Sequence, residues 1–123
     1  MKVRLTAGML RIRLDQSDAD GLLASGTVGF ALSLNGGTAL RCTLCTDAAA
    51  DTLSASLTDN AITVTLPADR ARRWLTSDAI SLEGQVGAGE ASTRILIEKD
   101  LGCRHSDDTA DAAANQMFDH LRE

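Results

Sequence analysis

Apolar and polar residues alternate in two short segments near the start of the chain. In Lys2–Leu5 and in Leu10–Leu14 every second residue is apolar, and a short turn at residues 6–8 separates the two segments. A period of two is typical of a strand with one buried face. The pattern therefore predicts a β-hairpin at the start of the chain.

A helical pattern follows this hairpin. Ser17 and Asp20 have the spacing of a capping box, and apolar residues recur at Ala19, Leu22 and Leu23. The next glycine, at position 26, can adopt the left-handed conformation that ends many helices. We expect a helix of about two turns.

A second hairpin completes this part of the chain. Thr27–Leu34 has the composition of a strand, and Asn-Gly-Gly at 35–37 suits the positive backbone angles of a tight turn. Leu40, Cys42 and Leu44 then alternate with other residues as in a fourth strand. The predicted order of elements is ββαββ.

The same order of elements recurs in the second half of the chain. The predicted elements are strands at Leu53–Leu57 and Ile62–Leu66, a helix with Pro67 as its first residue, and strands at Ala79–Val86 and Thr93–Glu98. Residues 62–82 align without a gap on residues 10–30. The sequence thus predicts two tandem repeats, 1–46 and 52–100, that arose by internal duplication.

Composition indicates an ordinary globular domain. The chain has 123 residues, of which 44% are hydrophobic and 24% charged, and this length normally forms one domain. Two Phe, one Trp and no Tyr imply an aliphatic core. We predict an α+β, mostly β fold: one pseudo-twofold, barrel-like domain over 1–105, followed by a C-terminal helix or tail over 106–123.

The apolar segments and the cysteine content indicate the cellular compartment of such a protein. No stretch has the length and apolar character of a membrane span or of a signal peptide. Three Cys are few, and they suggest a reducing compartment. We expect a bacterial cytoplasmic protein without a membrane partner.

Two segments resemble a family of small uncharacterised bacterial proteins. They are residues 11–14, RIRL, and residues 97–103, IEKDLGC. Members of that family open with an RLRL-type strand and a Ser-initiated helix, and they close with an (I/L)EKDxxC segment. The resemblance covers about residues 1–105 and implies no established activity.

Each ββαββ unit also resembles the swapped-hairpin units of AbrB and MazE, which are transition-state regulators and antitoxins. The matching residues are Ile62, Val64, Leu66, Pro67, Leu75, Ile80, Ile95 and Ile97. In that class two chains interlock into a barrel that binds DNA. The resemblance implies that this chain supplies both units of one barrel, but a fold alone does not give a function.

The polar face of the first hairpin carries four cations. They are Lys2, Arg4, Arg11 and Arg13, and the matching positions of the second repeat are neutral: Ser54, Ser56, Thr63 and Thr65. Adjacent cations can bind phosphate oxygens or an acidic partner. A symmetric DNA-binding surface would be basic in both repeats, and the net charge is −5. The alternatives are a solvated strand face, a protein-binding surface and, less favoured, a nucleic-acid-binding surface.

Three thiols and one imidazole make a formal set of zinc ligands: Cys42, Cys45, Cys103 and His105. Residues three apart in a strand point to opposite faces. Cys42 and Cys45 would therefore converge only if their strand ended between them. We expect no metal and no cofactor, and the zinc site is the weaker alternative.

Glu98-Lys99-Asp100 ends the last predicted strand. These residues either bind a partner along an edge strand or keep that edge soluble by their alternating charges. Both alternatives predict an edge position.

The chain lacks a nucleophile elbow, a phosphate-binding loop and a dinucleotide fingerprint. We therefore expect a non-enzymatic protein-interaction module that is a monomer or a homodimer. The alternative is a nucleic-acid-binding regulator or antitoxin-like protein that uses the four cations of the first hairpin.

The last eighteen residues have the pattern of an amphipathic helix. Ser106 can cap it, and its apolar stripe would be Ala110, Ala113, Ala114, Met117 and Leu121. We predict that this helix docks on the domain or on a second chain, and the alternative is an acidic tail.

Overall fold

The computed structural model describes residues 1–100, and its elements follow the order ββαββ twice. The first half contains β1 (Lys2–Thr6), β2 (Met9–Leu14), α1 (Gln16–Ser25), β3 (Thr27–Ser33) and β4 (Ala39–Asp47). The second half contains β5 (Ser54–Thr58), β6 (Ala61–Pro67), α2 (Ala68–Leu75), β7 (Ser81–Val86), the short 3-10 helix η1 (Gly89–Ala91) and β8 (Thr93–Lys99). The prediction of an α+β, mostly β fold is confirmed. The expected C-terminal helix or tail lies outside the described residues.

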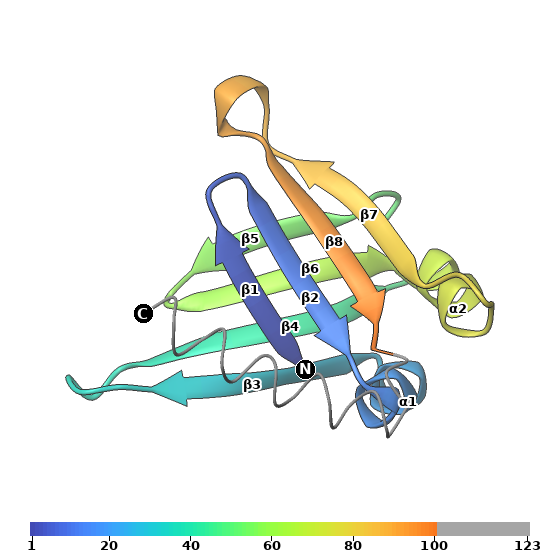
Figure 1. Ribbon diagram of the computed structural model, residues 1–123, viewed down its shortest axis with the longest axis horizontal. Helices are drawn as coiled ribbons and strands as arrows, with labels where there is room; N and C mark the ends of the chain where they lie inside the picture. The colour runs from blue at the N-terminus through green and yellow to red at the C-terminus, as the bar shows by residue number, and fades with distance from the viewer. Residues whose placement is uncertain (101–123) are drawn as a thin grey trace, which may run out of the picture.

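Each half of the chain contributes one hairpin to each of two sheets (Figure 1). Sheet A has the order β1-β2-β8-β7, and sheet B has the order β3-β4-β6-β5. In both sheets the two central strands are parallel and the outer pairs are antiparallel. The first hairpin therefore pairs with the last one rather than with its neighbour in sequence.

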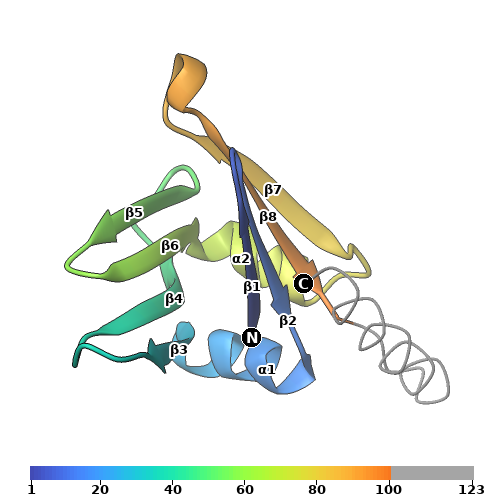
Figure 2. The ribbon, with the colours of Figure 1, turned by 60° about the vertical axis from the view of Figure 1, so that its left-hand side comes forward.

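The core lies between the facing sides of the two sheets (Figure 2). The alternation predicted for β2 and β6 places apolar side chains inward, and β4, β7 and β8 add further ones. The buried strand residues are Leu10, Ile12, Leu14, Cys42, Leu44, Val64, Leu66, Pro67, Leu82, Ile95 and Ile97. Burial of one such Leu or Ile side chain contributes roughly 1.5–3 kcal/mol.

Helix α1 follows β2 and begins two residues earlier than predicted. Asp15, not Ser17, is its N-cap: the Asp15 carboxylate accepts from the backbone N–H of Asp18 at 2.8 Å, and the Asp15 N–H donates back to the Asp18 carboxylate at 3.1 Å. Asp supplies the same acceptor as Ser, so the pattern alone did not separate the two caps. Gly26 has φ 80° and ends the helix as predicted. Of the expected apolar stripe, Leu22 is buried, whereas Leu23 is 47% exposed.

Helix α2 takes the corresponding place in the second half. Pro67 is its N-cap rather than its first helical residue. Ala71 and Trp74 form its buried side. Helices α1 and α2 contact each other, so they lie together at one end of the facing sheets (Figure 2).

The gap-free alignment of residues 62–82 on residues 10–30 holds before the helices but fails after them. In the first hairpins it holds, because Lys2 opposite Arg13 corresponds to Ser54 opposite Thr65. In the last hairpins the strand partners show that Leu82, opposite Ile97, takes the place of Val28, opposite Leu44. The alignment of Phe30 on Leu82 is therefore wrong. A single residue connects α1 to β3, whereas residues 76–80 connect α2 to β7.

Candidate functional site

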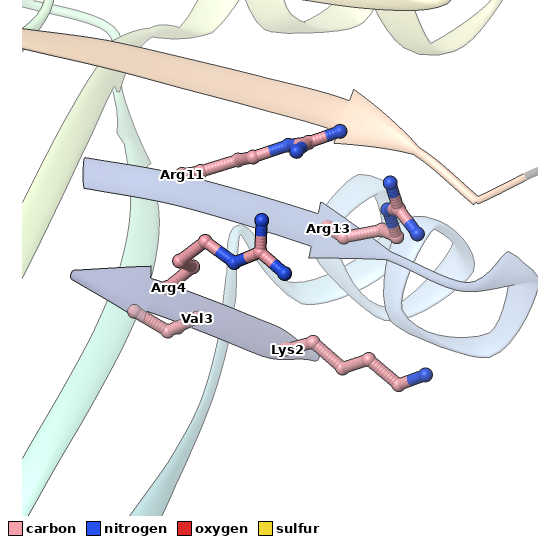
Figure 3. Close-up of a pocket in the computed structure, with 5 residues that line it drawn as sticks. All are labelled: Lys2, Val3, Arg4, Arg11 and Arg13. Carbon is pink, nitrogen blue, oxygen red and sulfur yellow. The ribbon is translucent and has the colours of Figure 1, made fainter. Parts of the chain in front are cut away.

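Four cations lie together on the outer side of sheet A. The antiparallel register places Lys2 opposite Arg13 and Arg4 opposite Arg11. With Val3 they line a shallow depression of about 220 Å³ (Figure 3). We call Lys2, Arg4, Arg11 and Arg13 the basic face. The prediction from alternation placed these residues on one side of the hairpin, and they are found there.

One carboxylate partly neutralises the basic face. Strand β8 is parallel to β2 and brings Glu98 opposite Arg13. Glu98 Oε1 accepts from Arg11 Nε at 2.7 Å and lies 3.8 Å from Arg13 Nη2. Within residues 1–100, Lys2 and Arg4 form no ion pair. The face therefore keeps an excess of positive charge on a chain whose net charge is −5.

Apolar and paired residues border the basic face. Leu96 of β8 lies opposite Arg11 and is half-buried. Further along, Arg94 Nη2 lies 2.7 Å from Glu83 Oε2, so this cation is already paired. Within residues 1–100 the unpaired charge is concentrated on β1, and β2 lies between β1 and the apolar Leu96 of β8.

The outer side of sheet B has the same register but different chemistry. Ser54 lies opposite Thr65, and Ser56 opposite Thr63. These hydroxyl residues occupy the places that the four cations occupy in sheet A. The two sheets therefore share a backbone arrangement without sharing a basic surface.

The segment Glu98-Lys99-Asp100 is not on an edge, and that prediction is wrong. Strand β8 lies between β2 and β7. Glu98 binds the basic face, and Lys99 Nζ donates to the Ser77 carbonyl at 2.7 Å while lying 5.4 Å from the centroid of the Trp74 ring. The backbone N–H of Asp100 donates to the Leu14 carbonyl at 2.6 Å. The three residues thus connect the end of β8 to β2 and to the end of α2.

The two described cysteines lie on opposite sides of β4. Cys42 faces the core, and burial raises the pKa of its thiol, which keeps the sulfur protonated. Cys45 is half-buried, with its sulfur 3.5 Å from the Thr65 hydroxyl. Cys103 and His105 of the weak zinc alternative lie outside the described residues. Among residues 1–100 no three His, Cys, Asp or Glu side chains come together as a metal site.

Two features near the helices gave no signal in the sequence. The N-terminal ammonium of Met1 lies 2.7 Å from Asp18 Oδ2. Partial burial acts to raise the pKa of Asp18, but the ammonium and the hydrogen bonds to Asp15 outweigh it and hold that pKa below its usual value. The indole N–H of Trp74 is buried and has no hydrogen-bond partner among residues 1–100. Both features depend on tertiary placement, which a local pattern does not encode.

No helix within residues 1–100 has the length and apolar character needed to cross a membrane.

Comparison with known proteins identifies a family but no activity. Neither a curated protein nor a solved structure matches the chain. A family model described as a family of unknown function (DUF7009) matches residues 1–120. The match covers nearly the whole sequence and agrees with the expected membership of an uncharacterised family. The chain therefore belongs to the DUF7009 family of unknown function.

Proposed function

We propose that this chain is a non-enzymatic protein-interaction module whose basic face binds an acidic segment of another protein. The observation that carries the proposal is that Lys2 and Arg4 have no ion-pair partner within residues 1–100 and lie beside a depression that Arg11 and Arg13 also line. Charge-assisted hydrogen bonds from these groups to carboxylates are stronger than neutral ones. A bacterial cytoplasmic location belongs to the same proposal.

A protein partner fits the site better than nucleic acid. The chain as a whole is acidic, so a long polyanion would meet repulsion beyond the basic face. The matching residues of sheet B are neutral, which removes the second contact surface that a twofold DNA reader would use. A short acidic peptide needs only one such surface, and Leu96 adds an apolar contact next to it.

The proposal extends to the architecture. A duplicated ββαββ unit with exchanged hairpins, similar to the units of AbrB and MazE, accounts for the repeated order of elements and for the parallel central pair in each sheet. Contact between β5 and β7 joins the two sheets along one side, as a barrel-like arrangement requires. The antitoxin-like alternative would share this architecture and differ in its ligand.

The two candidate ligands can be compared by measuring the binding of two probes of matched charge. One is a labelled Asp/Glu-rich peptide, and the other is a short DNA duplex. Fluorescence anisotropy gives the affinity of each probe over a series of salt concentrations. The test variant, K2S/R4S, introduces the residues that sheet B carries at the equivalent places. The matched control, R72S/R73S, removes the same charge from α2.

We expect K2S/R4S to weaken peptide binding by at least about tenfold. R72S/R73S should change it little beyond the general effect of net charge. Equal losses in both variants would show that only overall charge matters, and the proposal would be wrong. Tighter binding of the duplex than of the peptide, with a steep dependence on salt, would instead support the nucleic-acid alternative.

A further inference from the structure

The four edge strands of the two sheets differ in how they are protected. Strand β1 carries Lys2 and Arg4, and β5 is only five residues long. In β7 the carbonyl of Glu83 already accepts from Arg70 Nη2 at 2.8 Å. Charge, short length and side-chain caps are ways in which proteins prevent edges from pairing. Strand β3 has seven residues and no charged residue, and among residues 1–100 the only side-chain cap on its backbone is at its first residue, where the Ser25 hydroxyl donates to the Thr27 carbonyl.

Strand β3 also lies in the longest neutral stretch of the chain. Residues 21–40 contain no Asp, Glu, Lys, Arg or His. Two copies of a chain with a net charge of −5 repel each other least where such a stretch meets its counterpart. The edge of β3 is therefore the place where charge opposes self-association least.

The backbone groups on the free side of β3 can be assigned from the register. The Thr46 N–H donates to the Gly26 carbonyl at 2.9 Å, one step beyond the pair Thr27 and Cys45. Antiparallel pairs alternate between hydrogen-bonded and non-hydrogen-bonded. The even residues of β3 therefore bond to β4, and the odd residues direct their N–H and C=O groups away from it. Among these, the Thr27 carbonyl accepts from the Ser25 hydroxyl at 3.2 Å.

The remaining odd residues, Gly29, Ala31 and Ser33, present a row of backbone groups that have no partner within residues 1–100. On the core-facing side of the same strand, Phe30 is 39% exposed and Leu32 is 47% exposed. An edge with free backbone groups and exposed apolar side chains is a template for another strand. The small residues on its outer side offer no steric barrier.

We infer that β3 pairs with β3 of a second copy of this chain, antiparallel about a twofold axis at Ala31. This register places Gly29 opposite Ser33 of the second copy, so every free N–H and C=O of the three residues gains a partner. It also places Phe30 beside Leu32 of the second copy, where cross-strand apolar pairs stabilise a sheet. The edge is thus complementary to itself, as an isologous dimer requires. The two B sheets then form one continuous sheet.

The mass of the full chain in solution tests this pairing. Sedimentation equilibrium over a concentration series reaching the millimolar range should show a reversible monomer–dimer equilibrium. In the same series, the amides of Gly29, Ala31 and Ser33 should exchange faster in the dilute sample than in the concentrated one. Amides of even residues in β3 should not follow concentration in this way.

Two variants and one matched control identify the edge. A31P removes an N–H that does not bond to β4, and edge strands tolerate proline at such places. L32K places a charge on the apolar side of the strand and decides the outcome if A31P fails to fold. Both should weaken dimerisation by at least about tenfold. The control, L57K, changes an apolar residue that is 71% exposed on β5 and should leave the dimer intact.

Three results would overturn the inference. They are a monomer throughout the concentration series, a dimer that survives both A31P and L32K, and a dimer that L57K disrupts as strongly as L32K. A chain that stays monomeric but protects the three amides only when an extended peptide is added would show that the edge serves another protein. K2S/R4S should dimerise like the wild type, so this test is independent of the basic face.

Discussion

The hairpins β1–β2 and β5–β6 have the same register but opposite outer surfaces. Lys2 and Arg13 face each other in one, and Ser54 and Thr65 face each other in the other. On the inner side the two hairpins agree, since Leu14 and Leu66 are both buried. Burial against the opposite sheet restricts the inner positions, whereas the outer ones are free to differ. The difference therefore places four cations on the outer side of sheet A and hydroxyl residues at the equivalent positions of sheet B.

The largest effect is expected where the two hairpins agree. Leu14→Ala and Leu66→Ala each remove a side chain that is 1% exposed or less. Each should cost about 2–5 kcal/mol of unfolding free energy, because a cavity remains. Denaturant titration measures both. A cost below about 1 kcal/mol for one of them only would mean that the two places are not equivalent.

A smaller loss of stability is expected from alanine substitutions at two glycines, one in β3 and one in β7, and the two losses should differ. A Cβ at Gly29 would collide with the carbonyl oxygen of Cys42, which is backbone and cannot move freely. The three atoms nearest to a Cβ at Gly84 would all belong to the Leu53 side chain, the first of them at 3.1 Å. Gly29→Ala should cost about 1–3 kcal/mol, and Gly84→Ala should cost less. Thermal unfolding checks the order, and the reverse order would contradict the packing of β3 on β4.

The two helix starts differ by a side-chain cap. Asp15 caps α1, whereas Pro67 at the start of α2 makes no side-chain hydrogen bond. Asp15→Ala should cost about 1 kcal/mol of unfolding free energy. Ser17→Ala, at the cap that the sequence pattern suggested, should cost close to nothing. Similar losses from both substitutions would contradict the assigned cap.

The smallest effect depends on pH. The pKa of Asp18 is lowered in the folded chain, so its carboxylate stabilises the fold above its unfolded pKa, and this contribution is lost as pH falls through the folded pKa. Asp18→Asn should therefore destabilise the protein by about 1 kcal/mol at neutral pH. The difference from wild type should begin to shrink as pH falls below about 4, near the unfolded pKa, and should disappear only below the folded pKa. A difference that stays constant with pH would show that charge is not involved.

Local patterns predicted the strands and the sides that their residues face. Period two placed Arg11 and Arg13 on one side of β2 because alternation is a property of the backbone itself. The same reasoning did not predict that Glu98 lies beside them, since the pairing of β2 with β8 joins residues 87 positions apart in the chain. It also misplaced Glu98-Lys99-Asp100 on an edge, because strand order depends on which hairpins exchange partners. The shift between Val28 and Leu82 arises from a longer loop after α2, which a gap-free alignment does not reveal.

The comparison between the two hairpins can be tested by moving the charge from one to the other. The variant K2S/R4S/S54K/S56R keeps the net charge of −5 and places two cations on sheet B at the equivalent register. Its affinity for the labelled acidic peptide is the decisive measurement. If Arg11, Arg13 and Leu96 are part of the site, the variant should bind at least about tenfold more weakly than the wild type, like K2S/R4S. Wild-type affinity in the exchanged variant would show that any pair of cations suffices and would contradict a specific site on sheet A.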